Sequence, residues 1–324
     1  MNLKEYVVDE KLIAPLMGNP GAKYINKNLV EMSTNPDIHV KSILKLNEMF
    51  GPDIVFMMMD LSIEAEALGL KISFAKNEPP TVKTHPVNDE ESLNALNWGD
   101  FFQSKRVNDY IKAAKSLKEK IDVPLIAYVV GPFTLAGLLM GASQIAMETI
   151  DNPEFVSYAV EKCSNLIQEY SKKLQAAGAD SIVILEPTAT FLSPKSFWEF
   201  SGFYIKEMVD KGEIENLILH ICGNTTRILK EMERTGALGL SLDSDVDFSG
   251  ASSILKDETI IIGNINPVAF QNESAEIIRK LTTELMEKMK DRKNFILSTG
   301  CDLPYNSKEE NIREFFKAYE ECIK

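Results

Sequence analysis

Residues 153–187 read PEFVSYAVEKCSNLIQEYSKKLQAAGADSIVILEP and contain one complete helix-to-strand unit. The first part has apolar residues at helical spacing and reaches Gly178, a residue type that often ends helices because it adopts the left-handed conformation without strain. The second part, Ser181–Leu185, is a short and almost wholly apolar run. Such runs are typical of parallel strands that helices cover on both faces. The unit therefore predicts an α/β fold with a parallel sheet.

The same alternation repeats from about residue 50 to the end of the chain. Short β-rich runs alternate with amphipathic stretches such as ESAEIIRKLTTELMEKMKDRK, residues 273–293. Seven runs are predicted as strands: Asp53–Met59, Leu125–Val130, Ser181–Leu185, Asn216–Leu219, Ala237–Leu242, Thr259–Ile262 and Asn294–Leu297. No GxGxxG or GxxxxGK[ST] motif follows the first run, so the usual nucleotide-binding reason for an open sheet is missing. A closed TIM barrel is therefore favoured over an open, doubly wound sheet, with the eighth strand unassigned.

The chain is expected to form a single barrel domain over residues 1–324. No linker, low-complexity segment or internal repeat divides it. Residues 1–50 and the turn-rich stretch 76–89 are interpreted as an N-terminal extension that covers one end of the barrel.

Charge and cysteine content restrict the class of protein. The chain has 35 basic and 48 acidic side chains, a formal net charge of −13, and no basic run that would follow phosphates. Nucleic acid is therefore excluded as an expected partner. Four cysteines in 324 residues do not make a disulfide scaffold and suit a reducing compartment, and the N-terminus carries acids where a signal peptide needs a basic start. A cytoplasmic protein is expected.

One uncharged stretch, residues 123–147, is long enough to span a bilayer. However, Pro124, the Gly131-Pro132 pair and Gly137 interrupt it, and no basic flank orients it. We interpret it as a buried strand, a turn and a buried helix, and we expect no membrane association.

Polar and thiol side chains gather where the predicted strands end. In a TIM barrel these ends and the loops after them form the active site. The strand-end residues are Asp60, Gly131-Pro132, Glu186-Pro187, His220-Ile-Cys222, Asp243, Asn264-Ile-Asn266 and Cys301-Asp302.

The segment LILHICGNTT, residues 217–226, gives the most specific signal. His220 and Cys222 are two residues apart, so on an extended strand they point to the same side. Cys301 ends another predicted strand at the same rim. One imidazole and two thiolates suit Zn²⁺, and three protein ligands leave the fourth position open for a substrate. A structural zinc would normally have four ligands.

Other residues have simpler interpretations. Cys163 and Cys322 are expected to be buried hydrophobic side chains. Glu64 and Glu66 follow the first predicted strand and are interpreted as the solvated start of a helix. Asn224 precedes a helical stretch and could either cap it or contact a bound cofactor.

With these motifs the chain resembles the uroporphyrinogen decarboxylase superfamily, and within it the methylcorrinoid:coenzyme M methyltransferases. The similarity runs through nearly the whole chain, in PLMGNPGAKY, MMMDLSIEAEALG, PLIAYVVGPFTLAGLLMG, LEPTATFLSPKSFWEF, LHICGNTTRILKEM, IIGNINP and ILSTGCDLP. The resemblance implies a (β/α)8 barrel whose zinc is held by His220, Cys222 and Cys301. It also makes Asp243 a possible extra ligand or a partner to the metal.

Departures from the decarboxylase pattern favour the methyltransferase branch. The decarboxylases carry an Arg-rich motif that grips substrate carboxylates, whereas the equivalent GNPGAKY has only Lys23. A Tyr of their GPFTL-type segment corresponds to Leu138 here, and a His of their last strand-end motif corresponds to Cys301. Asp60 is common to both branches and does not discriminate.

The resemblance implies a zinc-bound thiol that accepts a methyl group from a methylated corrinoid protein. Coenzyme M is the favoured acceptor, and homocysteine or a folate are alternatives. Asp60 and Asp243 are candidate catalytic residues. Asn224 and Gly131, the first residue of the apolar GPFTLAGLLMGA, are candidate cofactor contacts at the barrel mouth. A uroporphyrinogen decarboxylase and a non-catalytic zinc- or corrinoid-binding barrel remain as alternatives.

Overall fold

Eight parallel strands form one sheet in the order β1-β10-β9-β8-β7-β6-β5-β2 in the computed structural model, which describes residues 3–7 and 10–324. The strands are β1 (Leu12–Ile13), β2 (Val55–Phe56), β5 (Leu125–Val130), β6 (Ser181–Leu185), β7 (Leu217–Ile221), β8 (Gly239–Leu242), β9 (Ile260–Ile265) and β10 (Phe295–Thr299). Each of the seven predicted runs overlaps one of these strands. The eighth strand, β1, lies within residues 1–50.

Asp53 joins the two edge strands of this sheet. Its backbone N–H donates to the carbonyl oxygen of Ile13 at 3.0 Å. In return, the N–H of Ile13 donates to Oδ2 of Asp53 at 2.8 Å. The strand at one end of the order, β1, is thereby tied to the residues that lead into β2 at the other end. These bonds bring the sheet round into the predicted TIM barrel.

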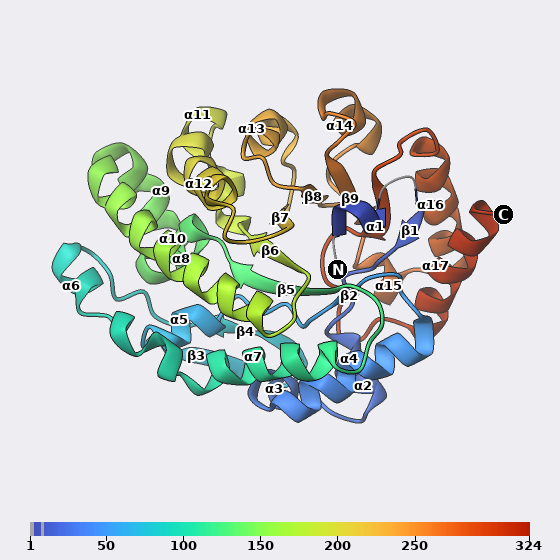
Figure 1. Ribbon diagram of the computed structural model, residues 1–324, viewed down its shortest axis with the longest axis horizontal. Helices are drawn as coiled ribbons and strands as arrows, with labels where there is room; N and C mark the ends of the chain where they lie inside the picture. Colours follow the sequence, from blue (N-terminus) through green and yellow to red (C-terminus); the bar gives the residue numbers. More distant parts are fainter. Residues whose placement is uncertain (1–2, 8–9) are drawn as a thin grey trace.

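Apolar side chains from all around the sheet fill the barrel interior. One buried cluster contains residues of β1, β2, β5, β6, β7, β9 and β10, including Phe56, Tyr128, Val183 and Ile218. A second and larger cluster packs the helices against the outer face of the sheet. Figure 1 shows the helices arranged around the strands. Burial on both faces explains why most strand sequences are almost wholly apolar.

The longer helices follow the strands in sequence and form the outer layer. Those of at least seven residues are α4 (Pro36–Phe50), α7 (Lys105–Lys118), α8 (Pro132–Met140), α9 (Ala142–Asp151), α10 (Pro153–Ala176), α12 (Phe203–Lys211), α14 (Phe248–Ile254), α16 (Ala275–Lys288) and α17 (Glu309–Cys322). Gly178, two residues after α10, has φ 113°, as expected for a residue that ends a helix.

Short helical pieces fill the loops. The α-helical ones are α1 (Leu3–Val7), α2 (Pro20–Tyr24), α3 (Leu29–Thr34), α5 (Ile63–Ala67), α6 (Glu90–Asn94), α11 (Pro194–Phe197), α13 (Leu229–Arg234) and α15 (Ala269–Asn272). The others are the 3-10 helices η1 (Trp98–Gln103), η2 (Pro187–Phe191) and η4 (Thr226–Ile228) and the π-helical turn η3 (Trp198–Gly202).

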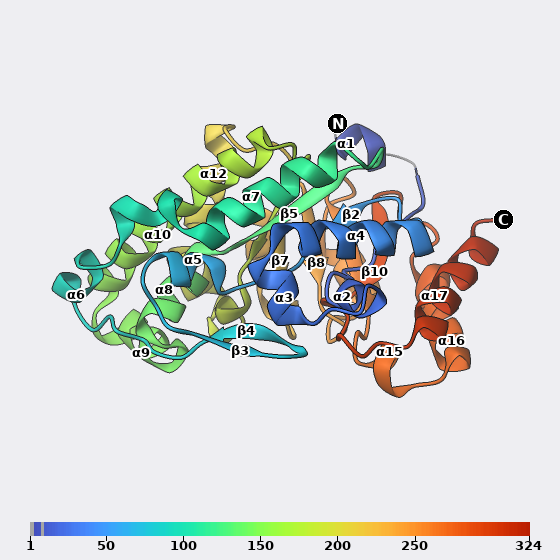
Figure 2. The same cartoon turned by 90° about the horizontal axis from the view of Figure 1, so that it is seen from below.

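Different elements cover the two ends of the barrel. Leu3 and Val7 of α1 belong to the interior cluster. A hairpin of β3 (Ile72–Ala75) and β4 (Glu78–Val82) lies on the opposite side, together with α9 and α15 (Figure 2). Both α9 and α15 follow the carboxyl ends of strands, so this second side is the barrel mouth.

The uncharged stretch 123–147 folds as the sequence predicts, into a buried strand, a turn and a helix. It contains β5 and α8, and eight of the nine residues of α8 are buried. Within the described residues, no single helix is long and apolar enough to cross a membrane. The pair α8 and α9 meets the criterion by length and composition only, with a bend of 104° between the helices.

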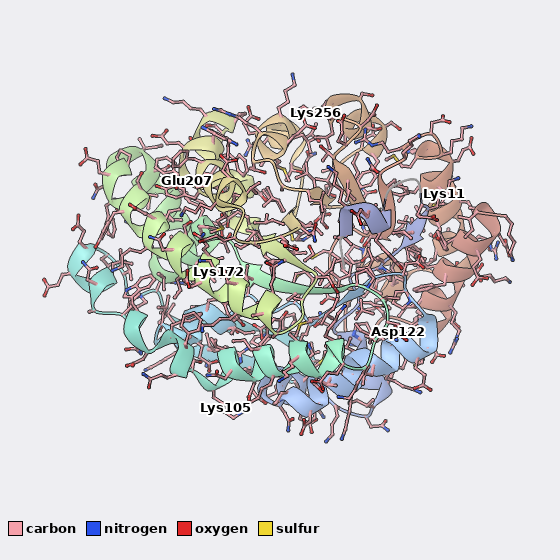
Figure 3. The ribbon with its side chains drawn as sticks, in the orientation of Figure 1. Lys11, Lys105, Asp122, Lys172, Glu207 and Lys256 are labelled. Atoms are coloured by element: carbon pink, nitrogen blue, oxygen red, sulfur yellow. The ribbon has the colours of Figure 1, made fainter. Side chains whose placement is uncertain are left out.

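The charged side chains labelled in Figure 3 lie at or near the surface. The six labelled in Figure 3 are Lys11, Lys105, Asp122, Lys172, Glu207 and Lys256; five of them are exposed and Lys172 is half-buried.

Candidate metal centre

The structure brings His220, Cys222 and Cys301 together at the barrel mouth. His220 lies on β7 and is 1% exposed, Cys222 directly follows that strand, and Cys301 follows β10. Nε2 of His220 lies 3.2 Å from Sγ of Cys222, which lies 3.6 Å from Sγ of Cys301. One donor atom from each residue fits within a common span of 4.8 Å.

These separations match the edges of a zinc tetrahedron. Zn–S bonds of about 2.3 Å and a Zn–N bond of about 2.0 Å place two sulfurs about 3.8 Å apart and a nitrogen about 3.5 Å from a sulfur. The observed 3.6 and 3.2 Å are close to these values. The residues therefore fit the metal, and a three-ligand set leaves one position open.

Ser241 of β8 orients the imidazole. Its Oγ lies 2.9 Å from Nδ1 of His220, and this contact leaves Nε2 facing Cys222. A hydrogen bond to one ring nitrogen commonly fixes which nitrogen binds a metal. Nε2 is therefore the nitrogen in position to be a ligand.

The environment of Cys301 favours the neutral form of its thiol until a cation is present. The hydrogen bond with Cys222 raises the pKa of the Cys301 thiol well above its ordinary value, and burial raises it further. His220 acts in the opposite direction. Coordination to Zn²⁺ deprotonates a thiol outright, which would reverse this preference.

Two side chains from neighbouring loops hold the backbone around Cys222. Oδ2 of Asp243 accepts a hydrogen bond from the N–H of Gly223 at 2.9 Å. The hydroxyl of Thr190 donates to the carbonyl oxygen of Cys222 at 2.6 Å. Gly223 has φ 84°, a conformation that glycine adopts without strain. Asp243 thus contacts the backbone next to Cys222, but it does not belong to the group of His220, Cys222 and Cys301 whose donor atoms lie together.

Asp60, a candidate catalytic residue, has a buried side chain that other residues hold in place. Its carboxylate forms an ion pair with Arg106, and Oδ1 accepts from the N–H and the hydroxyl of Ser62 at 2.9 and 2.7 Å. Arg106 also pairs with Glu66 at 2.7 Å. The Asp60 side chain is therefore engaged in a buried ionic network and is not among the grouped metal donors.

The interpretation of Glu64 as part of a solvated helix start is wrong. Glu64 is 1% exposed, and its Oε1 accepts a hydrogen bond from the N–H of Val130 at 3.0 Å. Its Oε2 has no hydrogen-bond partner among the described residues. Burial raises the pKa of this carboxyl to about 7. The short strand β2 ends before it reaches Val130, and Glu64 satisfies the N–H that is left over.

Gly131 is buried, and a side chain there would collide with the carboxylate of Glu186. Glu186 accepts hydrogen bonds from the N–H groups of Phe133 and Thr134 at 2.9 and 2.7 Å, so it anchors the first turn of α8. Asn224 is exposed, and its Oδ1 accepts from the N–H of Thr226 at 3.1 Å, in agreement with a capping role.

Sequence reasoning gave no role to Asp302 or Tyr128. Neither carboxylate oxygen of Asp302 has a hydrogen bond of normal geometry among the described residues, although the N–H groups of Asn19 and Gly18 face it. Burial raises the pKa of Asp302 to about 7. Tyr128 lies in the barrel interior below the thiols. In the sequence, only the position next to Cys301 points to Asp302. Tyr128 does not stand out because it lies within the apolar run of β5.

The family described as "Uroporphyrinogen decarboxylase (URO-D)" matches residues 13–322. The chain is 32% identical over 283 residues to "Methylcobamide:CoM methyltransferase MtbA" of Methanosarcina acetivorans, an alignment that covers 85% of this chain and 80% of the relative. It is 28% identical over 302 residues to the "Uroporphyrinogen decarboxylase" of Prochlorococcus marinus, covering 89% and 85%.

The solved structure of a "methyltransferase from Methanosarcina mazei" superposes on the chain with a TM-score of 0.89 at 25% identity. The superposition covers 99% of this chain and 97% of that one.

Proposed function

The chain belongs to the uroporphyrinogen decarboxylase family, and within it we propose a zinc-dependent methyltransferase that moves a methyl group from a methylated corrinoid to a thiol. Coenzyme M is the favoured acceptor, because a methylcobamide:CoM methyltransferase is among its relatives. The observation that carries the proposal is the triangle of His220, Cys222 and Cys301, with donor separations that fit zinc.

Each of these residues has a defined part in the proposed reaction. Zinc held there would keep an incoming thiol ionised at neutral pH. With zinc bound, Cys222 and Cys301 would supply negative charge, which would keep the substrate sulfur electron-rich, and Ser241 would hold the imidazole of His220 through Nδ1. The thiol loses its proton to solvent, its sulfur bonds to the methyl carbon, and the carbon–cobalt bond breaks with its electron pair left on cobalt.

The remaining candidate residues act around this centre. Asp243 positions the Cys222 loop through Gly223, and the Asp60–Arg106 pair stabilises the wall of the barrel mouth. Asn224 is exposed beside the metal loop and is available to a docked cofactor. Gly131 follows the carboxyl end of β5 and allows α8 to start against Glu186. Residues 1–324 act as one barrel domain.

The methyl donor must reach the mouth, so we propose a corrinoid protein as the partner. Two apolar side chains stand exposed in loops that follow strands: Phe191 after β6 is 70% exposed, and Val268 after β9 is 50% exposed. Such side chains on the rim would be covered by a docked partner.

A decarboxylase activity is the second candidate, since a relative bears that name. A substrate with many carboxylates needs several free cations. Lys23 stands alone in the equivalent segment, and its Nζ donates to the carbonyl oxygen of Ser307 at 3.2 Å. Arg106 is already paired with Asp60 and Glu66. This charge arrangement favours the methyltransferase.

The test is methyl transfer from free methylcobalamin to a panel of thiols, with and without a chelator. We expect loss of the methylcobalamin spectrum that depends on both thiol and zinc. Zinc-loaded protein that is inert with every thiol, and with a corrinoid protein as donor, would point to a binding barrel. Metal-independent release of CO₂ from uroporphyrinogen would replace the proposal with the second candidate.

A further inference from the structure

Tyr128 occupies the barrel interior directly below the metal centre. It lies on β5, belongs to the interior cluster with Phe56 and Ile218, and is 4% exposed. The strand register pairs Tyr128 with Val183 of β6, and Val183 with Ile218 of β7. Ile218 is two residues before His220, so Tyr128 starts one interior layer below the imidazole. A tyrosine side chain is long enough to cross one such layer.

The ring of Tyr128 is fixed and its hydroxyl is free to bind a ligand. The ring stacks on Phe56 with centroids 5.8 Å apart at 21°. The neighbouring Tyr110 has a hydroxyl that is already used, because it donates to the carbonyl oxygen of Met58 at 3.0 Å and accepts from the N–H of Tyr128 at 3.3 Å. Throughout residues 3–7 and 10–324, no hydrogen-bond partner is found for the hydroxyl of Tyr128.

The Tyr128 side chain lies close to Cys222, Cys301 and Asp302 at the candidate metal centre. Burial raises the pKa of Tyr128 well above its ordinary value, and the nearby carboxyl group of Asp302 raises it further. The hydroxyl therefore stays protonated and remains a hydrogen-bond donor. The hydroxyl oxygen is not among the fully enclosed side-chain atoms that lack a partner, so it faces open space where an arriving acceptor can reach it.

We propose that Tyr128 forms the floor of the thiol-binding position and donates a hydrogen bond to the sulfur of the incoming thiolate. The inference rests on the proposed function, because it needs a thiolate at the open metal position. An anionic sulfur is the acceptor that this donor lacks. Removal of the donor should weaken thiol binding about 10- to 100-fold, the usual effect of losing a hydrogen bond to a charged group. The turnover number should not fall, because a thiolate without that bond is at least as nucleophilic.

Cobalt(II)-substituted protein gives a test that does not depend on turnover. We would titrate it with 2-mercaptoethanesulfonate and follow the sulfur-to-cobalt charge-transfer band for wild type, Tyr128→Phe and Tyr170→Phe. Tyr170 is the matched control, because its hydroxyl also lacks a partner in the part of the chain described, but it is fully enclosed and lies on α10. The pKa shift of Tyr170 arises from burial and from Glu64, Tyr110 and Asp60.

The expected result is about 10- to 100-fold weaker thiol binding by Tyr128→Phe alone, with an unchanged resting cobalt spectrum and one metal per chain. KM for the thiol should rise, while kcat stays constant or rises. Equal thiol binding by wild type and Tyr128→Phe would overturn the inference and leave the function intact. A changed resting spectrum would also overturn it, because the hydroxyl would then be a metal ligand. A wild-type protein without a thiol-dependent band would remove the proposed function and the inference together.

Discussion

The carboxylate of Asp243 accepts a hydrogen bond from the backbone N–H of Gly223 at 2.9 Å, so a side chain at the end of β8 holds the residue that follows a candidate metal ligand of β7. Partners of this kind orient the metal ligands without touching the metal, and their loss typically costs about 10- to 100-fold in affinity or activity.

Asp243→Ala should therefore lower zinc affinity about 10- to 100-fold, measured by competition with a chromophoric chelator. Asp243→Asn should cost less, because an amide oxygen can still accept from Gly223. Asp245→Ala, an exposed neighbour, is the control and should bind zinc like wild type. Unchanged affinity and turnover in Asp243→Ala would remove this residue from the metal centre.

Cys301→Ala should reduce the zinc content sharply from about one ion per chain, because two ligands remain where a stable site needs at least three. Metal analysis of the purified protein measures this. Cys163→Ala is the matched control, since Cys163 is fully buried on α10 and its variant should keep its zinc. Full zinc retention in Cys301→Ala would show that this thiol is not a ligand.

Arg106→Met should destabilise the protein by about 3–5 kcal/mol, because it leaves the buried carboxylate of Asp60 without its countercharge. Urea unfolding measures the loss. The double variant Asp60→Asn/Arg106→Met should recover part of it. Arg313→Met, which breaks an exposed pair with Glu309, should change the stability little. Equal effects of the two single variants would argue against a buried network.

The contribution of Glu64 to the free energy of unfolding should fall as pH rises from about 4.5 to 7. Burial raises the pKa of this carboxyl in the folded protein to about 7, whereas the unfolded chain has the ordinary value near 4.5. The folded state therefore binds more protons in this window, and its advantage is lost as pH rises through 7. Relative to wild type, the free energy of unfolding of Glu64→Gln should increase by an amount on the order of 3 kcal/mol as pH rises from about 4.5 to 8.

Urea unfolding of wild type and Glu64→Gln at several pH values measures this difference. Glu119→Gln, at an exposed position, serves as the control and should run parallel to wild type. A difference between Glu64→Gln and wild type that does not change with pH would contradict the assignment.

The fold was predictable because buried parallel strands carry an apolar signature. Each of the seven predicted runs overlaps a strand, whereas β1 was missed because two residues make no pattern. The proximity of His220 and Cys222 was predictable for a local reason, since the two side chains share one side of a strand. The partners of acidic residues were not predictable, because they come from distant segments: Arg106 lies 46 residues beyond Asp60, and Val130 lies 66 residues beyond Glu64. Only the folded chain shows that Glu64 replaces a missing strand partner.

The ligand spacing also bears on the order in which the chain assembles. Cys222 and Cys301 are 79 residues apart, and β8 and β9 lie between their strands in the sheet. If an ion bound Cys222 and Cys301 in a disordered chain, its binding would include the entropic cost of closing a long loop. Once the four strands have assembled, that loop is already closed. Metal capture should therefore come late in folding. A bound ion would join the ends of β7 and β10 and so restrain the strands between them. Proteolysis of the zinc-free protein should therefore occur first between β7 and β10.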